Sequence, residues 1–142
     1  MKTSRSLMSV LLAVISIMTI TGCETFGPKY ATVRNDTAVL PEEKGRIVFY
    51  RPSSHYGYGM RPDILLNGKK VGTSRPGTIF FVDVDPGKWQ VTVPAVLYPG
   101  KTSIDISIPQ HETVYVKTSF GPSAFAGRTD IEVVNSEKAM TE

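Results

Sequence analysis

Cysteine and histidine are scarce in this chain of 142 residues, which contains one Cys and two His. A single cysteine excludes an intramolecular disulfide framework and a zinc site built from thiolates alone. The two histidines, His55 and His111, give no basis for a histidine-rich metal centre. We therefore expect no metal ion and no other cofactor to be needed by this chain.

The sequence also lacks a large excess of either positive or negative charge. The 16 Lys and Arg residues outnumber the 13 Asp and Glu residues by only three, and the longest basic run is the pair Lys69 and Lys70. No segment carries the basic stripe or basic run that proteins use to neutralise nucleic-acid phosphates. The composition therefore argues against nucleic acid as a partner.

Catalytic signatures are missing from the sequence. There is no Gly-x-Ser-x-Gly nucleophile elbow, no HExxH zinc motif and no Gly-rich phosphate loop. Asp83 and Asp85 share strand parity, so that a paired-carboxylate or calcium role is an open alternative. However, Asp85 opens a predicted turn, where aspartate is favoured because its side chain hydrogen-bonds the backbone. We therefore predict that the protein is not an enzyme.

The first 22 residues contain the one long apolar run of the chain. Lys2 and Arg5 precede an uncharged apolar stretch at residues 7–20, which is typical of a secretory signal peptide and too short to span a membrane. The tetrapeptide ITGC that ends at Cys23 resembles the bacterial lipobox. The resemblance implies cleavage before Cys23 and attachment of lipid to its thiol, so that the membrane becomes a partner through the lipid. The alternative is an ordinary signal peptide followed by an incidental cysteine.

The residue after the cysteine bears on location. Glu24 follows Cys23, whereas an Asp at this position would resemble the inner-membrane retention signal of enteric bacteria. We therefore expect an outer-membrane lipoprotein of the bacterial envelope that faces the periplasm. Removal of residues 1–22 leaves 14 basic and 13 acidic side chains, a net charge of +1, so that the apparent basicity belongs largely to the export segment.

The rest of the chain divides into a lipidated Cys and tether at residues 23–44, a β-domain at 45–134 and a tail at 135–142. After residue 44 apolar residues alternate with polar ones, and turn residues recur every 8–12 positions, a spacing typical of β-sandwiches. We predict an all-β fold, a small sandwich of about seven to eight short, mostly antiparallel strands. The expected strands are residues 46–51, 63–66, 69–72, 78–84, 88–93, 102–108, 112–120 and 128–134. Asn135 or Ser136 could cap one helical turn at the end.

Side-chain placement within these strands can also be predicted. Asn67-Gly68 is the strongest short signal for a hairpin, because a type I′ turn needs positive φ at both central residues. Alternation directs Trp89 inward, and we expect it at the centre of the core with Phe80 or Phe81. In the last strand the same alternation directs Ile131 and Val133 inward.

A family resemblance rests on three segments of the predicted domain. Residues 47–52 (IVFYRP), 66–72 (LNGKKVG) and 80–88 (FFVDVDPGK) together resemble an uncharacterised family of bacterial lipoproteins known as domain of unknown function twenty-eight forty-six. The resemblance implies a PEGA-like or transthyretin-like β-sandwich on a lipid anchor. It brings no catalytic or binding residues to this chain.

The segment 52–62 is the most unusual in composition, because His55, Tyr56, Tyr58 and Arg61 alternate with glycine, serine and proline. Tyrosine rings on a flexible backbone are common in binding loops, although these rings could simply pack over the end of the sandwich. We expect a non-catalytic interaction module whose partner is another envelope protein. The alternative is a carbohydrate- or peptidoglycan-binding module that uses the Tyr-rich loop, with a second loop at 120–127 as a candidate neighbour.

Overall fold

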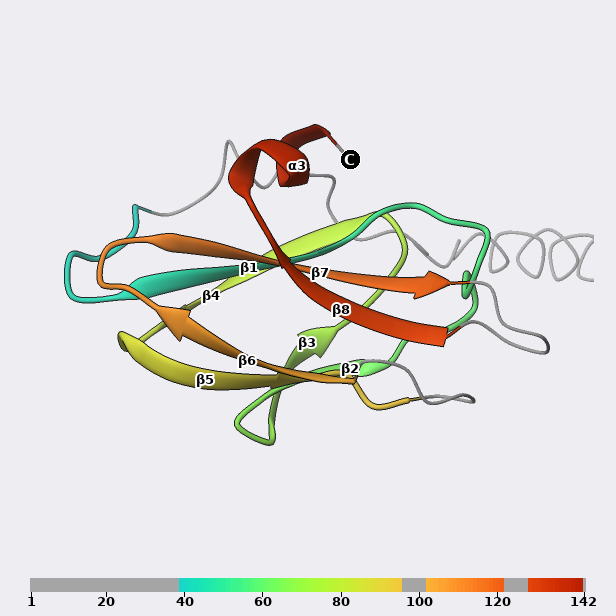
Figure 1. The fold of residues 1–142 in the computed structure, drawn as a ribbon, viewed down its shortest axis with the longest axis horizontal. Coiled ribbons are helices and arrows are strands. Elements are labelled where there is room, and N and C mark those ends of the chain that lie inside the picture. Colours follow the sequence, from blue (N-terminus) through green and yellow to red (C-terminus); the bar gives the residue numbers. More distant parts are fainter. Residues whose placement is uncertain (1–38, 96–101, 122–127, 142) are drawn as a thin grey trace, which may run out of the picture.

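The computed structural model describes residues 39–95, 102–121 and 128–141 of the chain (Figure 1). The predicted signal peptide, Cys23 and most of the predicted tether lie outside the described residues. In the described part, eight strands precede one short helix. The elements are β1 (Gly45–Arg51), β2 (Asp63–Leu66), β3 (Lys69–Thr73), β4 (Thr78–Val84), β5 (Gly87–Thr92), β6 (Ser103–Ile108), β7 (Thr113–Gly121), β8 (Arg128–Val134) and α3 (Ser136–Thr141).

The strands form two sheets of four that pack face to face (Figure 1). Sheet A has the order β4-β1-β7-β8 and sheet B the order β3-β2-β5-β6. The pairing is antiparallel everywhere except between β1 and β7, which run parallel. The predicted small, mostly antiparallel β-sandwich is therefore confirmed.

Strand β1 is buried along its whole length. Ile47 and Phe49 point into the space between the sheets, and both side chains are fully buried. Val48 and Tyr50 point to the other face of sheet A and belong to a second apolar cluster. This explains why the segment is apolar on both faces, since each face has its own cover.

The cover of the outer face is helix α3. The Asn135 side chain accepts a hydrogen bond from the Lys138 backbone N–H at 2.8 Å. Asn135, one of the two residues predicted to cap the helix, is therefore its N-cap. Ala139 packs from α3 onto the second apolar cluster, which includes Val134 at the end of β8. The tail is therefore part of the packed structure, although the helix is only six residues long.

The predicted position of Trp89 at the centre of the core is wrong. That centre is held by Ile47 and Phe49, and Phe80 stacks on Phe49 with ring centroids 5.2 Å apart. Trp89 is only partly buried at the rim of the same cluster. Strand β5 pairs with β2 only as far back as Val91, so no neighbouring strand flanks the indole on that side. Phe81 lies on the outer face of sheet A, under the Arg46 guanidinium.

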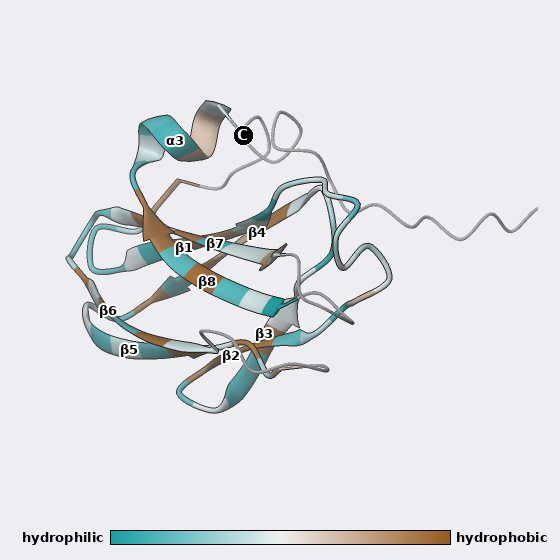
Figure 2. Ribbon diagram, turned by 45° about the vertical axis from the view of Figure 1, so that its right-hand side comes forward, coloured by the Kyte–Doolittle hydropathy of each residue, from teal (hydrophilic) through white to brown (hydrophobic). Residues whose placement is uncertain are grey.

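The predicted burial of Val133 is also wrong, while that of Ile131 is confirmed. Val133 is 53% exposed, whereas Ile131 is fully buried. Both side chains share one face of β8, but Val133 lies near the end of this edge strand, which has a partner on one side only. Figure 2 shows hydrophobic and hydrophilic residues alternating along β8.

The predicted hairpin turn is confirmed at Asn67 and Gly68, with φ angles of 46° and 80° between β2 and β3. The second predicted Pro-Gly turn, at residues 98–101, lies outside the described residues. Within the part of the chain that the structure describes, no helix is long and apolar enough to cross a membrane.

Candidate functional site

The Tyr-rich segment 52–62 joins β1 to β2 at one end of the sandwich (Figure 1). Tyr56 and Tyr58 are 56% and 47% exposed, and His55 and Arg61 are exposed as well. About half of each tyrosine is therefore open to solvent. The structure brings all four predicted binding residues together on one exposed loop.

Arg51, the last residue of β1, holds this loop in place from below. Its Nη1 group donates hydrogen bonds to the carbonyl oxygens of Met60 at 2.8 Å and Ser74 at 3.2 Å. Its Nη2 group donates to the carbonyl oxygen of Gly57. One guanidinium thus ties the middle and the end of the loop to the connection between β3 and β4.

Phe120, near the end of β7, completes this support. The Arg51 guanidinium lies over the Phe120 ring, 4.3 Å from its centroid, in a cation–π contact. The loop passes so close to this ring that a Cβ at Gly57 would lie 2.6 Å from it, and Gly57 also has a positive φ of 65°. Glycine is therefore required at this position. The predicted partner loop 120–127 meets the Tyr-rich loop through Phe120, while its residues 122–127 lie outside the described residues.

The environment of Arg51 is unusual for a charged group. The residue is 2% exposed, and burial lowers the pKa of its guanidinium to about 10. It therefore stays positive at neutral pH. In the described ranges its hydrogen-bond acceptors are carbonyl oxygens and no carboxylate. Buried charges need such partners to offset lost hydration. Arg51 was not among the predicted binding residues. Its one local signal is a cation that directly follows the apolar run Ile47–Tyr50.

A groove of about 320 Å³ lies beside the loop on the β1–β7 side. Its lining combines two hydroxyl groups, two cations and an aromatic ring, contributed by Arg51, Pro52, Ser54, Lys117, Ser119 and Phe120. Lys117 lies 3.9 Å from the Glu132 carboxylate.

The carboxylates considered for catalysis take part in ion pairs. Asp83 accepts two hydrogen bonds from the Arg46 guanidinium, at 2.6 and 2.8 Å. Asp85 is paired with Lys44 at 2.7 Å, and this contact raises the pKa of the lysine. The Arg46–Asp83 pair joins β1 to β4, and the Lys44–Asp85 pair joins the residue before β1 to the turn after β4. Across residues 39–95, 102–121 and 128–141, no three His, Cys, Asp or Glu residues come together as a metal site would require.

His111 has a different environment from the residues of the loop. It lies in the turn between β6 and β7 with a positive φ of 57°, and its backbone N–H donates to the Lys44 carbonyl oxygen at 2.7 Å. The histidine is exposed and far along the sheet from His55. The structure does not bring the two histidines together.

Comparison of the chain with protein families, curated proteins and solved structures finds no match. The resemblance to a lipoprotein family therefore stays a prediction, and function has to be argued from the residues themselves.

Proposed function

We propose that this chain is a lipid-anchored lipoprotein of the bacterial envelope whose β-sandwich is a non-catalytic interaction module. The proposal assigns contact with another envelope protein to loop 52–62. One observation carries it: the buried Arg51 fixes the backbone of the loop while Tyr56 and Tyr58 remain half exposed. The anchor itself is proposed on the sequence around Cys23.

A fixed loop with exposed tyrosines suits binding for a physical reason. Association costs free energy when flexible segments become ordered, so a loop that is already held loses less. Tyrosine has few rotatable bonds and a large ring with a polar tip, which is why it is enriched at protein interfaces. The neighbouring Arg61 and His55 add polar contacts around the rings.

Site-specific crosslinking in cells tests the contact surface. A photo-reactive amino acid at position 56 or 58 should crosslink to one discrete envelope protein. The same group at Lys69, on the exposed hairpin between β2 and β3, is the matched control and should give no such product. A Tyr58 probe that captures no more protein than the Lys69 probe contradicts the proposal.

Isolated peptidoglycan sacculi test the alternative. On the proposal, a Tyr56→Ala/Tyr58→Ala double variant that carries the photo-reactive amino acid at position 61 loses the crosslinks that this probe gives in the parent chain, and its retention on sacculi does not change. Retention on sacculi that vanishes in this double variant, without a protein crosslink in the parent chain, would replace the protein partner by a glycan at this loop.

The anchor is tested separately by Cys23→Ala. The parent protein should incorporate radiolabelled palmitate and stay with the membrane fraction, and the variant should do neither, because its lipid attachment point is gone. Palmitate label in the Cys23→Ala protein would remove the lipid anchor from the proposal and leave the crosslinking result standing.

A further inference from the structure

The open edges of the two sheets differ in how well they are protected against pairing with another strand. Sheet A ends at β4 and β8, and sheet B ends at β3 and β6. An edge strand presents unpaired backbone N–H and C=O groups, and proteins usually protect it with charged side chains, bulges or short length. Comparison of the four edges therefore shows where the domain can accept a further strand.

Two of the edges carry several charges. Strand β3 has five residues and begins with two lysines, and its pairing with β2 is interrupted by a register shift between Ile64 and Leu65. Strand β8 contains Arg128, Asp130 and Glu132 at every second position. An added strand at either edge would have to displace water from these charges.

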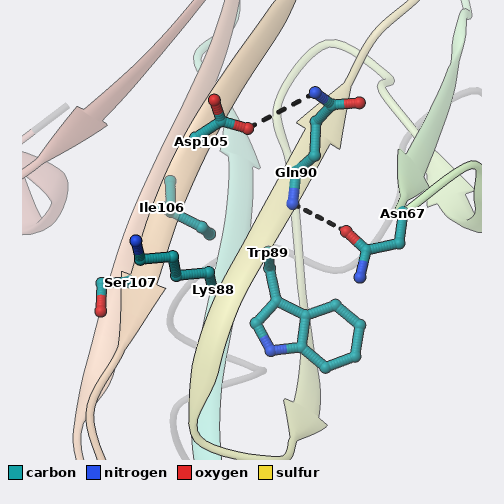
Figure 3. A pocket seen from close by; sticks show the side chains of 7 residues that line it. All are labelled: Asn67, Lys88, Trp89, Gln90, Asp105, Ile106 and Ser107. Atoms are coloured by element: carbon teal, nitrogen blue, oxygen red, sulfur yellow. Dashed lines mark hydrogen bonds between the residues drawn. The ribbon is translucent and has the colours of Figure 1, made fainter.

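Strand β6 is protected by polar side chains. Asp105 and Ser107 are exposed on it, beside a groove of about 470 Å³ that Trp89 of β5 also lines. Asp105 accepts a hydrogen bond from the Gln90 Nε2 group at 3.4 Å, and both polar ends point away from the indole (Figure 3). A carboxylate therefore lies at the middle of this edge as well.

Strand β4, with the sequence TIFFVDV, lacks such protection. It is seven residues long and pairs with β1 in one regular register over its whole length. Phe80 and Val82 belong to the core cluster, while Ile79 and Phe81 belong to the cluster on the outer face of sheet A. Its one charged residue, Asp83, is already held in an ion pair. Segments of this length with high β-propensity, little charge and no proline pair readily with further strands.

The backbone of β4 also has donors and acceptors that are directed away from β1. The Arg46 N–H in β1 donates toward β7, so the next residue of β1 and every second one after it direct their backbone groups to β4. They meet every second residue of β4. The residues between these, Ile79, Phe81 and Asp83, direct their backbone groups to the open side. Within residues 39–95, 102–121 and 128–141 these groups have no hydrogen-bond partner.

We infer that the open edge of β4 pairs antiparallel with β4 of a second copy of this chain. A two-fold axis at Phe81 lets all three open residues take part. Phe81 pairs with Phe81 of the second copy, and Ile79 pairs with Asp83 of the second copy. Each such pair exchanges two hydrogen bonds. The two copies of sheet A then form one continuous sheet, related by the two-fold symmetry that is commonest among protein dimers.

Strand β4 is complementary to itself in this register. On the core side Phe80 lies opposite Val82 of the second copy, and on the outer side the two Phe81 rings lie opposite each other. Aromatic and β-branched residues form favourable pairs across strands. The two Asp83 carboxylates do not meet, since each lies opposite Ile79. A strand of another protein would need this same pattern, whereas a second copy carries it already.

This inference goes beyond the proposed function, because β4 and loop 52–62 share no residue and either contact can exist without the other. Disulfide trapping in the purified full chain tests the register. Directly paired residues have Cα atoms about 5.5 Å apart, within reach of a disulfide. On mild oxidation, Phe81→Cys should give several-fold more disulfide-linked dimer than the parent, in which Cys23 sets the background.

Ser107→Cys is the matched control for this experiment, because Ser107 is exposed on the edge strand β6. It should stay at the background of the parent. No dimer above background with Phe81→Cys overturns the inference. A disulfide from this position to a different protein overturns it too.

A charge at the two-fold axis tests the contact without a new cysteine. Phe81→Glu places two carboxylates opposite each other in the dimer. Within one copy the new carboxylate lies beside the Arg46 guanidinium, which now covers the ring 4.0 Å from its centroid, so the fold is kept. Two differently tagged copies of the parent should copurify, and two copies of Phe81→Glu should not, although their circular dichroism matches that of the parent.

Co-expression of Phe81→Glu with Phe81→Lys should restore copurification, because opposite charges then meet at the axis. Restoration also shows that both charged chains still fold. Ser107→Glu is the matched control and should copurify as the parent does. Copurification of two Phe81→Glu copies at the level of the parent overturns the inference, as does failure of two parent copies to copurify.

Discussion

Among single residues, two aromatic side chains of the core cluster, Phe49 and Trp89, differ in what surrounds them. Phe49 is fully buried between the sheets, and Trp89 lies at the rim beside an open groove. Phe49→Ala should therefore lower the free energy of unfolding by about 3–5 kcal/mol, the range for a core phenylalanine. Trp89→Ala should cost less, because part of the indole is already in contact with water. Urea denaturation followed by circular dichroism compares them, and an equal or larger loss for Trp89→Ala would contradict this placement.

Asp63, on the β2–β3 hairpin, should make the free energy of unfolding depend on pH in the acidic range. The Lys70 ammonium, 2.7 Å away, lowers the pKa of Asp63 from its usual 3.8. A carboxyl group whose pKa is lower in the folded state stabilises the fold above its unfolded pKa, and this stabilisation is lost as the pH falls through the folded pKa. Asp63→Asn should therefore lose less stability than the parent when the pH falls below about 3.8.

Thermal unfolding between pH 5 and pH 2 measures this effect, which is small because the pair is exposed. Lys70→Met should show the same weaker response to acid as Asp63→Asn, because either change removes the pair. A Lys70→Met protein with the full acid response of the parent would show that the pair does not cause it.

The limits of prediction at the residue scale are clear from three positions. Asn67 was predictable because the type I′ turn is a local property of two residues. Alternation predicted which face Trp89 occupies but not how far the neighbouring strand extends, and this length decided its exposure. The role of Arg51 could not be predicted, because the carbonyl oxygens that accept its hydrogen bonds belong to residues 57, 60 and 74, which only the folded chain brings together.

At the scale of elements, helix α3 stabilises sheet A by covering its outer face. Ala139 is buried against the second apolar cluster, while the next residue, Met140, is 54% exposed. Ala139→Asp should lower the free energy of unfolding by roughly 1–3 kcal/mol, because the charge must either be buried or displace the helix. Met140→Asp is the matched control and should stay close to the parent in a thermal melt.

Binding of an apolar dye reports the same event. If Ala139→Asp displaces α3, the cluster around Val48 and Tyr50 is uncovered, and fluorescence of the dye should rise at temperatures where the sandwich is still folded. An Ala139→Asp protein as stable as Met140→Asp would mean that α3 contributes little to the fold.

The loop between β1 and β2 is the second element whose state can be measured. Arg51→Lys keeps the positive charge but replaces the planar fork by a single ammonium, which cannot reach the same set of carbonyl oxygens. Hydrogen exchange in residues 52–62 should accelerate several-fold, while exchange in β7 and β8 stays slow. Arg75→Lys, at an exposed arginine between β3 and β4, should leave the loop unchanged. Unaltered exchange in the Arg51→Lys loop would mean that the guanidinium does not hold it.

Strand positions were largely predictable, because each strand carries its own alternation and is bounded by turn residues. Their pairing was not. The parallel contact of β1 with β7 joins segments separated by most of the domain, and nothing in either segment specifies a parallel neighbour. The cap of α3 at Asn135 was local and therefore predictable, whereas the surface that the helix covers depends on the whole of sheet A.

At the scale of the whole molecule, the two ends of the sandwich have different surroundings. Residues 41–44 enter β1 at one end, where the Lys44 carbonyl oxygen accepts from His111 N–H and the Glu42 carbonyl oxygen from the Gln110 side chain. Loop 52–62 leaves β1 at the other end (Figure 1). If a lipid anchor lies upstream of residue 39, the chain from the anchor would enter the domain at the end of β1 opposite the proposed contact loop.

The central position of β1 in sheet A also determines how the domain would respond to mechanical force. This strand has β4 on one side and β7 on the other, and its ladder hydrogen bonds run across the strand direction. A pull on residues 39–44 against a partner held at loop 52–62 enters and leaves at the two ends of β1, so the covalent backbone of an already extended strand carries the load. The ladders on either side of β1 then carry little of this load, whereas a pull across the strands would open their hydrogen bonds one at a time. The topology therefore favours a domain that resists extension between its two ends.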